Sequence, residues 1–190
     1  MTVDPTKVIA ETRAWVDRAV IGLNLCPFAK AVQVKQQVRY LCSEAREPEA
    51  LLEQLCAELH HLAEVDPAVT DTTLLIHPQV LTDFLDFNDF LEVVDTAVEE
   101  LGYGGVLQVA SFHPDFQFAD TRFDDVTNAT NRAPYPTLHL LREDSIDRAV
   151  TAFPEAERIY EANMATLEKL GSKGWAALRA QCRKDADDAE

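Results

Sequence analysis

Three of the five histidines stand where a strand is expected to end or to begin. His77 and His113 each follow a short apolar segment and precede a proline, and His139 lies near the start of the apolar segment 137–141. An imidazole can exchange a proton near neutral pH and can bind a divalent metal ion. Because a following proline favours extended backbone, we expect both His-Pro pairs to leave the sheet on stiff chain.

Three imidazoles at one rim of a sheet suit two kinds of metal chemistry. Bound to zinc, they leave a position for a water molecule that becomes a hydroxide-like nucleophile near neutral pH. His113, His139 and Asp115 also match the two-histidine, one-carboxylate set of non-haem iron sites. The candidate cofactor is therefore a divalent metal, zinc or iron, with His77, His113, His139 and Asp115 as its candidate ligands. The alternative is that each histidine is structural and hydrogen-bonded to a carbonyl group.

A long irregular segment between the last two expected strands holds further candidates. Most connections in compact domains are a few residues long, whereas this one contains Asn128, Asn131, Arg132 and Tyr135 among several aromatic residues. Without a metal, a histidine can act as general acid or base while Arg132 holds a carboxylate or phosphate through two parallel hydrogen bonds. We expect these four residues to bind substrate. Alternatively, the asparagines only stabilise turns and Arg132 is a surface arginine.

Cys26 is a candidate nucleophile in the segment Gly22–Lys30. It precedes a proline that suits the first position of a short helix, and Lys30 follows one turn later. A thiol at a helix amino end next to a cation has a lowered pKa and can react with the help of a histidine. The alternative is that Cys26, among Leu25 and Phe28, only fills space in the core.

Apolar periodicity and capping residues predict the elements that must position these groups. The order of helices and strands along the chain predicts a single-domain α/β sandwich over residues 1–183. Its four-stranded sheet is expected to be mostly parallel with an antiparallel last strand, and helices are expected at both ends of the chain. Residues 184–190 are expected to form a frayed acidic tail. Helices are expected at 4–22, 48–63, 82–102, 144–152 and 155–170, and strands at 32–42, 72–76, 106–112 and 137–141.

This topology brings the candidate residues together. The carboxyl ends of parallel strands share one edge, where ligands bind in open α/β sheets, so His77, His113 and His139 are expected to converge there. The helix that begins near Thr82 would point its free N–H groups at the same edge, which suits an anionic ligand.

Composition limits the possible partners and compartments. The 190 residues include 33 acidic and 17 basic side chains, for a formal net charge of -16, and no basic run interrupts this surface. A nucleic-acid partner is therefore not expected. The amino end lacks a signal-peptide pattern, and no apolar run approaches the length of a membrane span. Four cysteines without close pairing indicate a reducing, cytoplasmic location.

Four long and unusual segments resemble a bacterial family known as domain of unknown function 1415. They are AVIGLNLCPFAK (19–30), TTLLIHPQVL (72–81), LQVASFHPDFQFA (107–119) and NRAPYPTLHLLRE (131–143). The resemblance extends over roughly residues 10–175. It implies a cytoplasmic bacterial protein, and it supplies no catalytic residue.

Two principal hypotheses for function follow. The first is an enzyme, hydrolytic or otherwise metal-assisted or using histidine acid/base chemistry, that acts on a small anionic molecule. The second is a non-catalytic module that binds a small molecule or a peptide between the aromatic residues of the irregular segment. A third is an interaction protein whose acidic surface meets a basic partner. The oligomeric state is left open.

Overall fold

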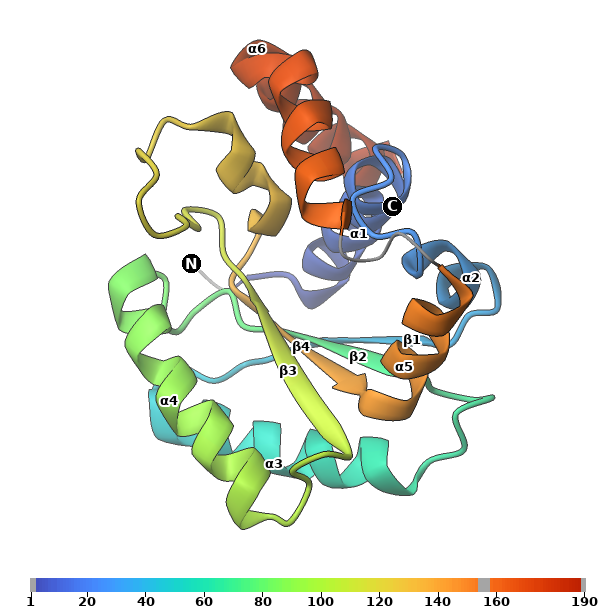
Figure 1. The fold of residues 1–190 in the computed structure, drawn as a ribbon. Coiled ribbons are helices and arrows are strands. Elements are labelled where there is room, and N and C mark those ends of the chain that lie inside the picture. The colour runs from blue at the N-terminus through green and yellow to red at the C-terminus, as the bar shows by residue number, and fades with distance from the viewer. Residues whose placement is uncertain (1–2, 154–157, 189–190) are drawn as a thin grey trace.

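Four short strands form one mixed sheet between two layers of helices in the computed structural model, which describes residues 3–153 and 158–188 (Figure 1). The strands lie in the order β1-β2-β4-β3. Their bounds are Val38–Cys42 for β1, Thr72–Ile76 for β2, Leu107–Phe112 for β3 and Thr137–Arg142 for β4.

The sheet is mixed because the last strand lies inside it. β1 and β2 pair in parallel, whereas β4 pairs antiparallel with both β2 and β3. The expected antiparallel last strand is confirmed, but the expected mostly parallel sheet is wrong, since two of the three strand pairings are antiparallel. β1, β2 and β3 still run in one direction, so His77 and His113 leave the sheet at the same edge, where β4 begins.

Each face of the sheet has its own helical layer (Figure 1). α3 (Pro48–Glu64) and α4 (Phe84–Glu100) cover one face. α1 (Pro5–Trp15), the π-helical segment η1 (Val16–Ile21) and α6 (Ile159–Asp188) lie on the other. The remaining helices are α2 (Ala29–Val34), the 3-10 segment η2 (Val126–Asn131) and α5 (Glu143–Ala152).

Capping explains where the two clearest helices begin. The Asp4 side chain accepts a hydrogen bond from the backbone N–H of Thr6, and Pro5 occupies the first turn of α1. Asp83 accepts from the N–H groups of Leu85 and Asp86 at the start of α4. These N–H groups are thus partly satisfied inside the chain. The expectation that the amino end of this helix offers free N–H groups to a ligand is therefore wrong for the two that Asp83 binds.

Alternation along the strands divides the core into two clusters. Leu75, Leu138 and Leu140 pack with α3 and α4, in the first cluster. Leu74 and Ile76 face the other way and pack with α1, η1 and α6, in the second cluster. Because successive side chains of a strand point to opposite faces, a shift of one position moves a residue from one cluster to the other.

Three segments differ from the expectations. Residues 32–37, expected as the start of a strand, form α2 and the turn after it, and β1 begins only at Val38. Gly171, with φ of 69°, breaks α6 into two helical parts, so the expected end of a helix at residue 170 is confirmed, but a second part follows to Asp188 and makes most of the expected frayed tail helical. Residues 155–157 of the last predicted helix lie outside the described residues.

The described part of the chain contains no helix with the length and apolar character needed to cross a membrane.

Candidate functional site

His77 and His113 form a buried pair on the α4 face of the sheet. Both side chains are fully buried, and both rings pack against Phe87, with ring centroids 5.5 Å and 5.2 Å from that of Phe87. Phe84 contacts the ring of His113 from the first turn of α4. The structure thus brings these two predicted residues together.

The hydrogen bonds of this histidine pair define two different tautomers. His77 donates from Nδ1 to the carbonyl oxygen of Val80 over 2.9 Å, which leaves Nε2 as a bare acceptor. His113 accepts at Nδ1 from the backbone N–H of Asp115 over 3.0 Å, so its Nε2 carries the proton. Both Nε2 atoms are buried without a hydrogen-bond partner. The Nε2 atom of His77 can therefore only accept a hydrogen bond, and that of His113 can only donate one.

Burial keeps both imidazoles neutral. Loss of hydration and, to a smaller extent, the neighbouring His113 lower the pKa of His77 to about 4, against the opposing hydrogen bond to the carbonyl of Val80. Burial also lowers the pKa of His113, against the opposing effect of the carbonyl groups of Leu81 and Thr82. A neutral, enclosed pair with no path for substrate acts as part of the core.

His139 lies on the opposite face of the sheet. It stands between Leu138 and Leu140, which pack with α3 and α4, so its side chain points away from them. It contacts Phe112, a member of the second cluster, with ring centroids 6.0 Å apart. The expected convergence of three imidazoles is therefore wrong, because His139 has the opposite phase in its strand from His77 and His113.

The expected metal ligands are consequently not assembled as a set. Asp115 is exposed, and its backbone N–H occupies Nδ1 of His113. Within residues 3–153 and 158–188, no group of three or more His, Cys, Asp and Glu side chains is arranged to hold a metal ion.

Asn128 and Asn131 organise the irregular segment from inside. The fully buried Asn128 accepts at Oδ1 from the N–H of Phe118 and the hydroxyl of Thr121, and it donates to the carbonyl of Arg122. Asn131 donates to the carbonyl of Ser111 in β3. These hydrogen bonds agree with the alternative given from the sequence, in which the two asparagines stabilise turns.

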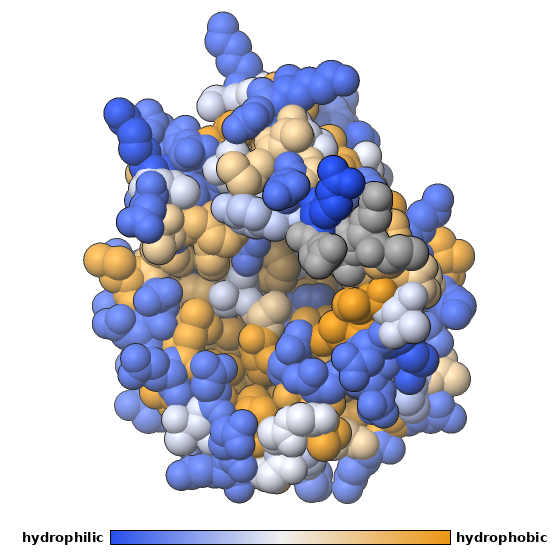
Figure 2. Space-filling model, viewed as in Figure 1, coloured by the Kyte–Doolittle hydropathy of each residue, from blue (hydrophilic) through white to orange (hydrophobic). Residues whose placement is uncertain are grey.

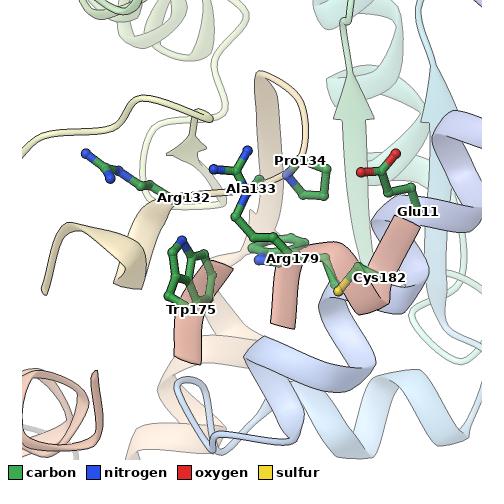
Figure 3. Close-up of a pocket in the computed structure, with 8 residues that line it drawn as sticks. Glu11, Arg132, Ala133, Pro134, Trp175, Arg179 and Cys182 are labelled. Carbon is green, nitrogen blue, oxygen red and sulfur yellow. The ribbon is translucent and has the colours of Figure 1, made fainter. Parts of the chain in front are cut away.

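Arg132 also holds this segment. Its Nε donates to the carbonyl of Phe116 over 3.0 Å and its Nη2 to that of Phe123 over 2.7 Å. The guanidinium carbon lies 4.9 Å from the centre of the Phe123 ring. In Figure 3 the side chain extends away from Ala133 and Pro134, so its guanidinium is engaged with the loop.

Tyr135 connects the segment to α1. Its hydroxyl donates to Oε2 of the buried Glu11 over 2.9 Å. Burial raises the pKa of the Tyr135 hydroxyl, and the adjacent Glu11 carboxylate raises it further. The hydroxyl is therefore a hydrogen-bond donor in the interior.

The face of the sheet that carries His139 is partly open. Figure 2 shows a hollow in the middle of the molecule, bordered by hydrophobic atoms, and in Figure 1 this region lies between the sheet, α5 and the start of α6. Four side chains on this face of β3 and β4 remain partly exposed, and we call them the hollow floor: Ala110, Phe112, His139 and Leu141.

Thr72 fixes the tautomer of His139. The Thr72 hydroxyl donates to the carbonyl of Leu140 over 2.6 Å, so it must accept from His139 Nε2, which is 2.7 Å away. The lone pair of His139 is then on Nδ1. Surrounding protein lowers the pKa of His139 to about 4 although part of its surface remains open, because the ring loses most of its hydration.

Cys26 is not activated as a nucleophile. Burial raises the pKa of its thiol, and the backbone N–H groups of Phe28 and Ala29 offset this only in part. The expected lowering of the Cys26 pKa is therefore wrong. α2 begins only at Ala29, and the thiol lies too deep among apolar groups for the helix end to stabilise a thiolate.

A second concavity lies between α1, α6 and residues 132–134 (Figure 3). Its space of about 240 Å³ includes its mouth, and only about 10 Å³ can hold the centre of a water molecule, which is room for about one water. We call it the arginine pocket, and its polar and aromatic lining comprises Glu11, Trp15, Arg132, Trp175, Arg179 and Cys182.

Sequence reasoning missed the residues of α6 in this pocket. Trp175, Arg179 and Cys182 have the spacing of one helix face, and this spacing was the available signal. No helix is expected from the sequence after residue 170, whereas the structure continues α6 beyond Gly171.

Together these features define a mixed α/β sandwich with one buried histidine pair, one open sheet face and one arginine-lined pocket. The family model described as protein of unknown function (DUF1415) matches residues 7–177, and the chain belongs to this family. Neither the curated proteins nor the solved structures gave a match.

Proposed function

We propose that the protein binds a small organic molecule in the hollow over β3 and β4, with His139 as its polar contact. The single observation that supports this most is the partial exposure of His139 and Leu141 on β4. β4 is an inner strand of the sheet, paired on both sides. Helices pack on both faces of this sheet, so an uncovered patch on its inner strand is a gap in one helical layer and offers a place for a ligand.

The floor and walls of the hollow favour a ligand with an apolar or aromatic body. Phe112 belongs to the floor, Phe153 lines a concavity together with Pro27 and Ile159, and two edge-to-face ring pairs are present in the chain, Phe118–Tyr160 and Phe28–Phe153. Tyr160 and Phe153 are exposed large side chains. Rings of this kind contribute large contact areas to ligand sites.

His139 would supply the specificity. Thr72 holds its Nε2–H, so Nδ1 can only accept, and a pKa of about 4 keeps the ring neutral at physiological pH. The complementary ligand group is an N–H or O–H donor. An uncharged donor suits this position, because the buried ring resists gaining a proton.

An acid/base enzyme is the second candidate, and the fixed tautomer of His139 favours it, since a bare Nδ1 can take a proton from a substrate. The pKa decides between the two proposals. General bases work best with a pKa near the operating pH, and a value of about 4 makes His139 a weak base. Binding without turnover is therefore our first proposal.

Ligand-observed NMR with indole, benzimidazole and phenol as probes tests the proposal. We expect binding of these N–H and O–H donors to be lost in His139→Leu and kept in His61→Gln, a matched change at an exposed histidine of α3. Thr72→Val removes the hydroxyl that fixes the tautomer of His139 and should weaken binding. Equal binding to the wild type and His139→Leu would remove the proposal, and product signals appearing during incubation would favour the enzyme.

A further inference from the structure

We infer that the arginine pocket is a binding site for a carboxylate, held by Arg179 and the two indole N–H groups. This site is separate from the hollow and does not depend on the ligand proposed there. It lies between α1, α6 and residues 132–134, where no function has yet been placed (Figure 3).

Two buried donors in the arginine pocket lack acceptors. Trp15 and Trp175 are 3% and 6% exposed, and the Nε1–H of each is buried with no hydrogen-bond partner. Both indoles line the same pocket. In Figure 3 the nitrogen of Trp175 points towards the segment that carries Arg132 and Ala133. Buried indole N–H groups normally find an acceptor, so two in one pocket indicate an acceptor that binds there.

Arg179 is available to an anion. It is half-buried and makes no hydrogen bond or ion pair with another described residue. Burial lowers the pKa of Arg132 and the charge of Arg179 lowers it further, whereas the carboxylates of Asp115 and Asp125 raise it, so these two carboxylates act on Arg132. In a chain with a net charge of -16, a half-buried arginine without an ion pair suits a negative ligand.

Glu11 is the one carboxylate in the pocket lining. Its Oε2 accepts from Tyr135, and Figure 3 places Glu11 beyond Pro134 from the guanidinium of Arg179. No ion pair joins Glu11 to either arginine among the described residues. The lining therefore keeps a positive balance.

The size of the pocket favours a carboxylate over a phosphate. The interior has room for about one water molecule, which is the space of one carboxylate oxygen. A planar carboxylate can place one oxygen between the indoles and the other against the guanidinium fork. A tetrahedral phosphate would need the walls to separate. The ligand class is thus a small carboxylic acid.

Tryptophan fluorescence gives a direct test, because Trp15 and Trp175 are the only tryptophans in the chain and both line the pocket. Formate and acetate are titrated into the full-length protein at constant ionic strength, against chloride and phosphate. We expect a saturable change in emission with formate and acetate only. Arg179→Gln should weaken binding about tenfold or more, the loss of a charged hydrogen bond.

Two further variants keep the test decisive. Arg183→Gln removes the same charge from an exposed position one turn along α6 and should bind like the wild type. Arg179→Lys keeps the charge without the fork and should give an intermediate affinity. An ordered water is the competing occupant. Absence of a saturable change, an equal response in Arg179→Gln, or an equal response to phosphate would each overturn the carboxylate assignment.

Discussion

Mild acid should destabilise the protein through His77 and His139, which must gain protons when the chain unfolds. Burial lowers the pKa of each from the ordinary 6.5 to about 4. Between these values the unfolded chain binds more protons than the folded chain. The stabilising contribution of these histidines is therefore fully present above pH 6.5, and the free energy of unfolding decreases as the pH falls towards about 4.

The expected loss is large compared with ordinary stability. Each group changes the free energy of unfolding by about 1.4 kcal/mol per pH unit inside this window, so His77 contributes about 3 kcal/mol. The partly exposed His139 contributes less, and the two together give a loss of about 5 kcal/mol. Domains of this kind have about 5–15 kcal/mol in total, so unfolding near the lower end of the window is expected.

Other titrating groups act in the same direction or at lower pH. Burial lowers the pKa of His113 as well, which adds to the loss. Hydrogen bonds lower the pKa of the partly exposed Asp125 and Asp185 below the ordinary 3.8, so their contribution disappears only below that pH. The histidines therefore lower the free energy of unfolding at a higher pH than these carboxylates do.

Urea unfolding followed by circular dichroism at several pH values between 7 and 4 measures the effect. His77→Gln and His139→Gln should each reduce the pH slope of the free energy of unfolding by about one proton, whatever they do to stability at pH 7. His61→Gln, at an exposed site, should leave the slope unchanged. A wild-type slope retained in both buried variants would mean that these histidines do not cause the loss of stability in acid.

Three further changes test other parts of the structure. Arg132→Ala should lower the free energy of unfolding by about 2 kcal/mol, because two bonds to carbonyl groups are lost, and should expose residues 116–131 to limited proteolysis; unchanged cleavage would contradict this role. Cys26 should react with iodoacetamide more slowly in the native protein than in urea, since burial raises its pKa; faster native alkylation, read by mass spectrometry, would contradict the burial argument. Truncation after Arg183 should lower the melting temperature, because it removes the buried Ala186 and the ion pairs of Asp185 and Asp187 with Arg18 and Lys7; a melting temperature equal to that of the full chain would mean that the tail does not dock.

Local signals predicted the helices and most strands because their causes are local. Asp83 caps α4 and Pro48 begins α3, and apolar spacing marks the buried faces of both helices. The signal fails at α2, which has no fully buried residue, so no core contact imposes a helical period on Val32 and Val34. The alternation of apolar and polar residues around Val32 and Val34 resembles that of a strand by chance.

The candidate site required information that lies outside any one segment. Whether His139 meets His77 depends on the pairing of β4, and Leu74 opposite His139 faces the second cluster. A shift of one residue along a strand moves a side chain from one face of the sheet to the other. The partners of Arg132 come from residues up to 16 positions earlier in the chain, and no periodicity reveals such bonds.

The place of β4 in the sheet has a consequence for synthesis on the ribosome. Among the described residues, β3 pairs with β4 and with no other strand, and β4 ends at Arg142. A nascent chain that has not yet emerged that far leaves the edges of β2 and β3 unpaired. Completion of the sheet must therefore wait until Arg142 has left the ribosome, and a chaperone that shields strand edges would act before that point.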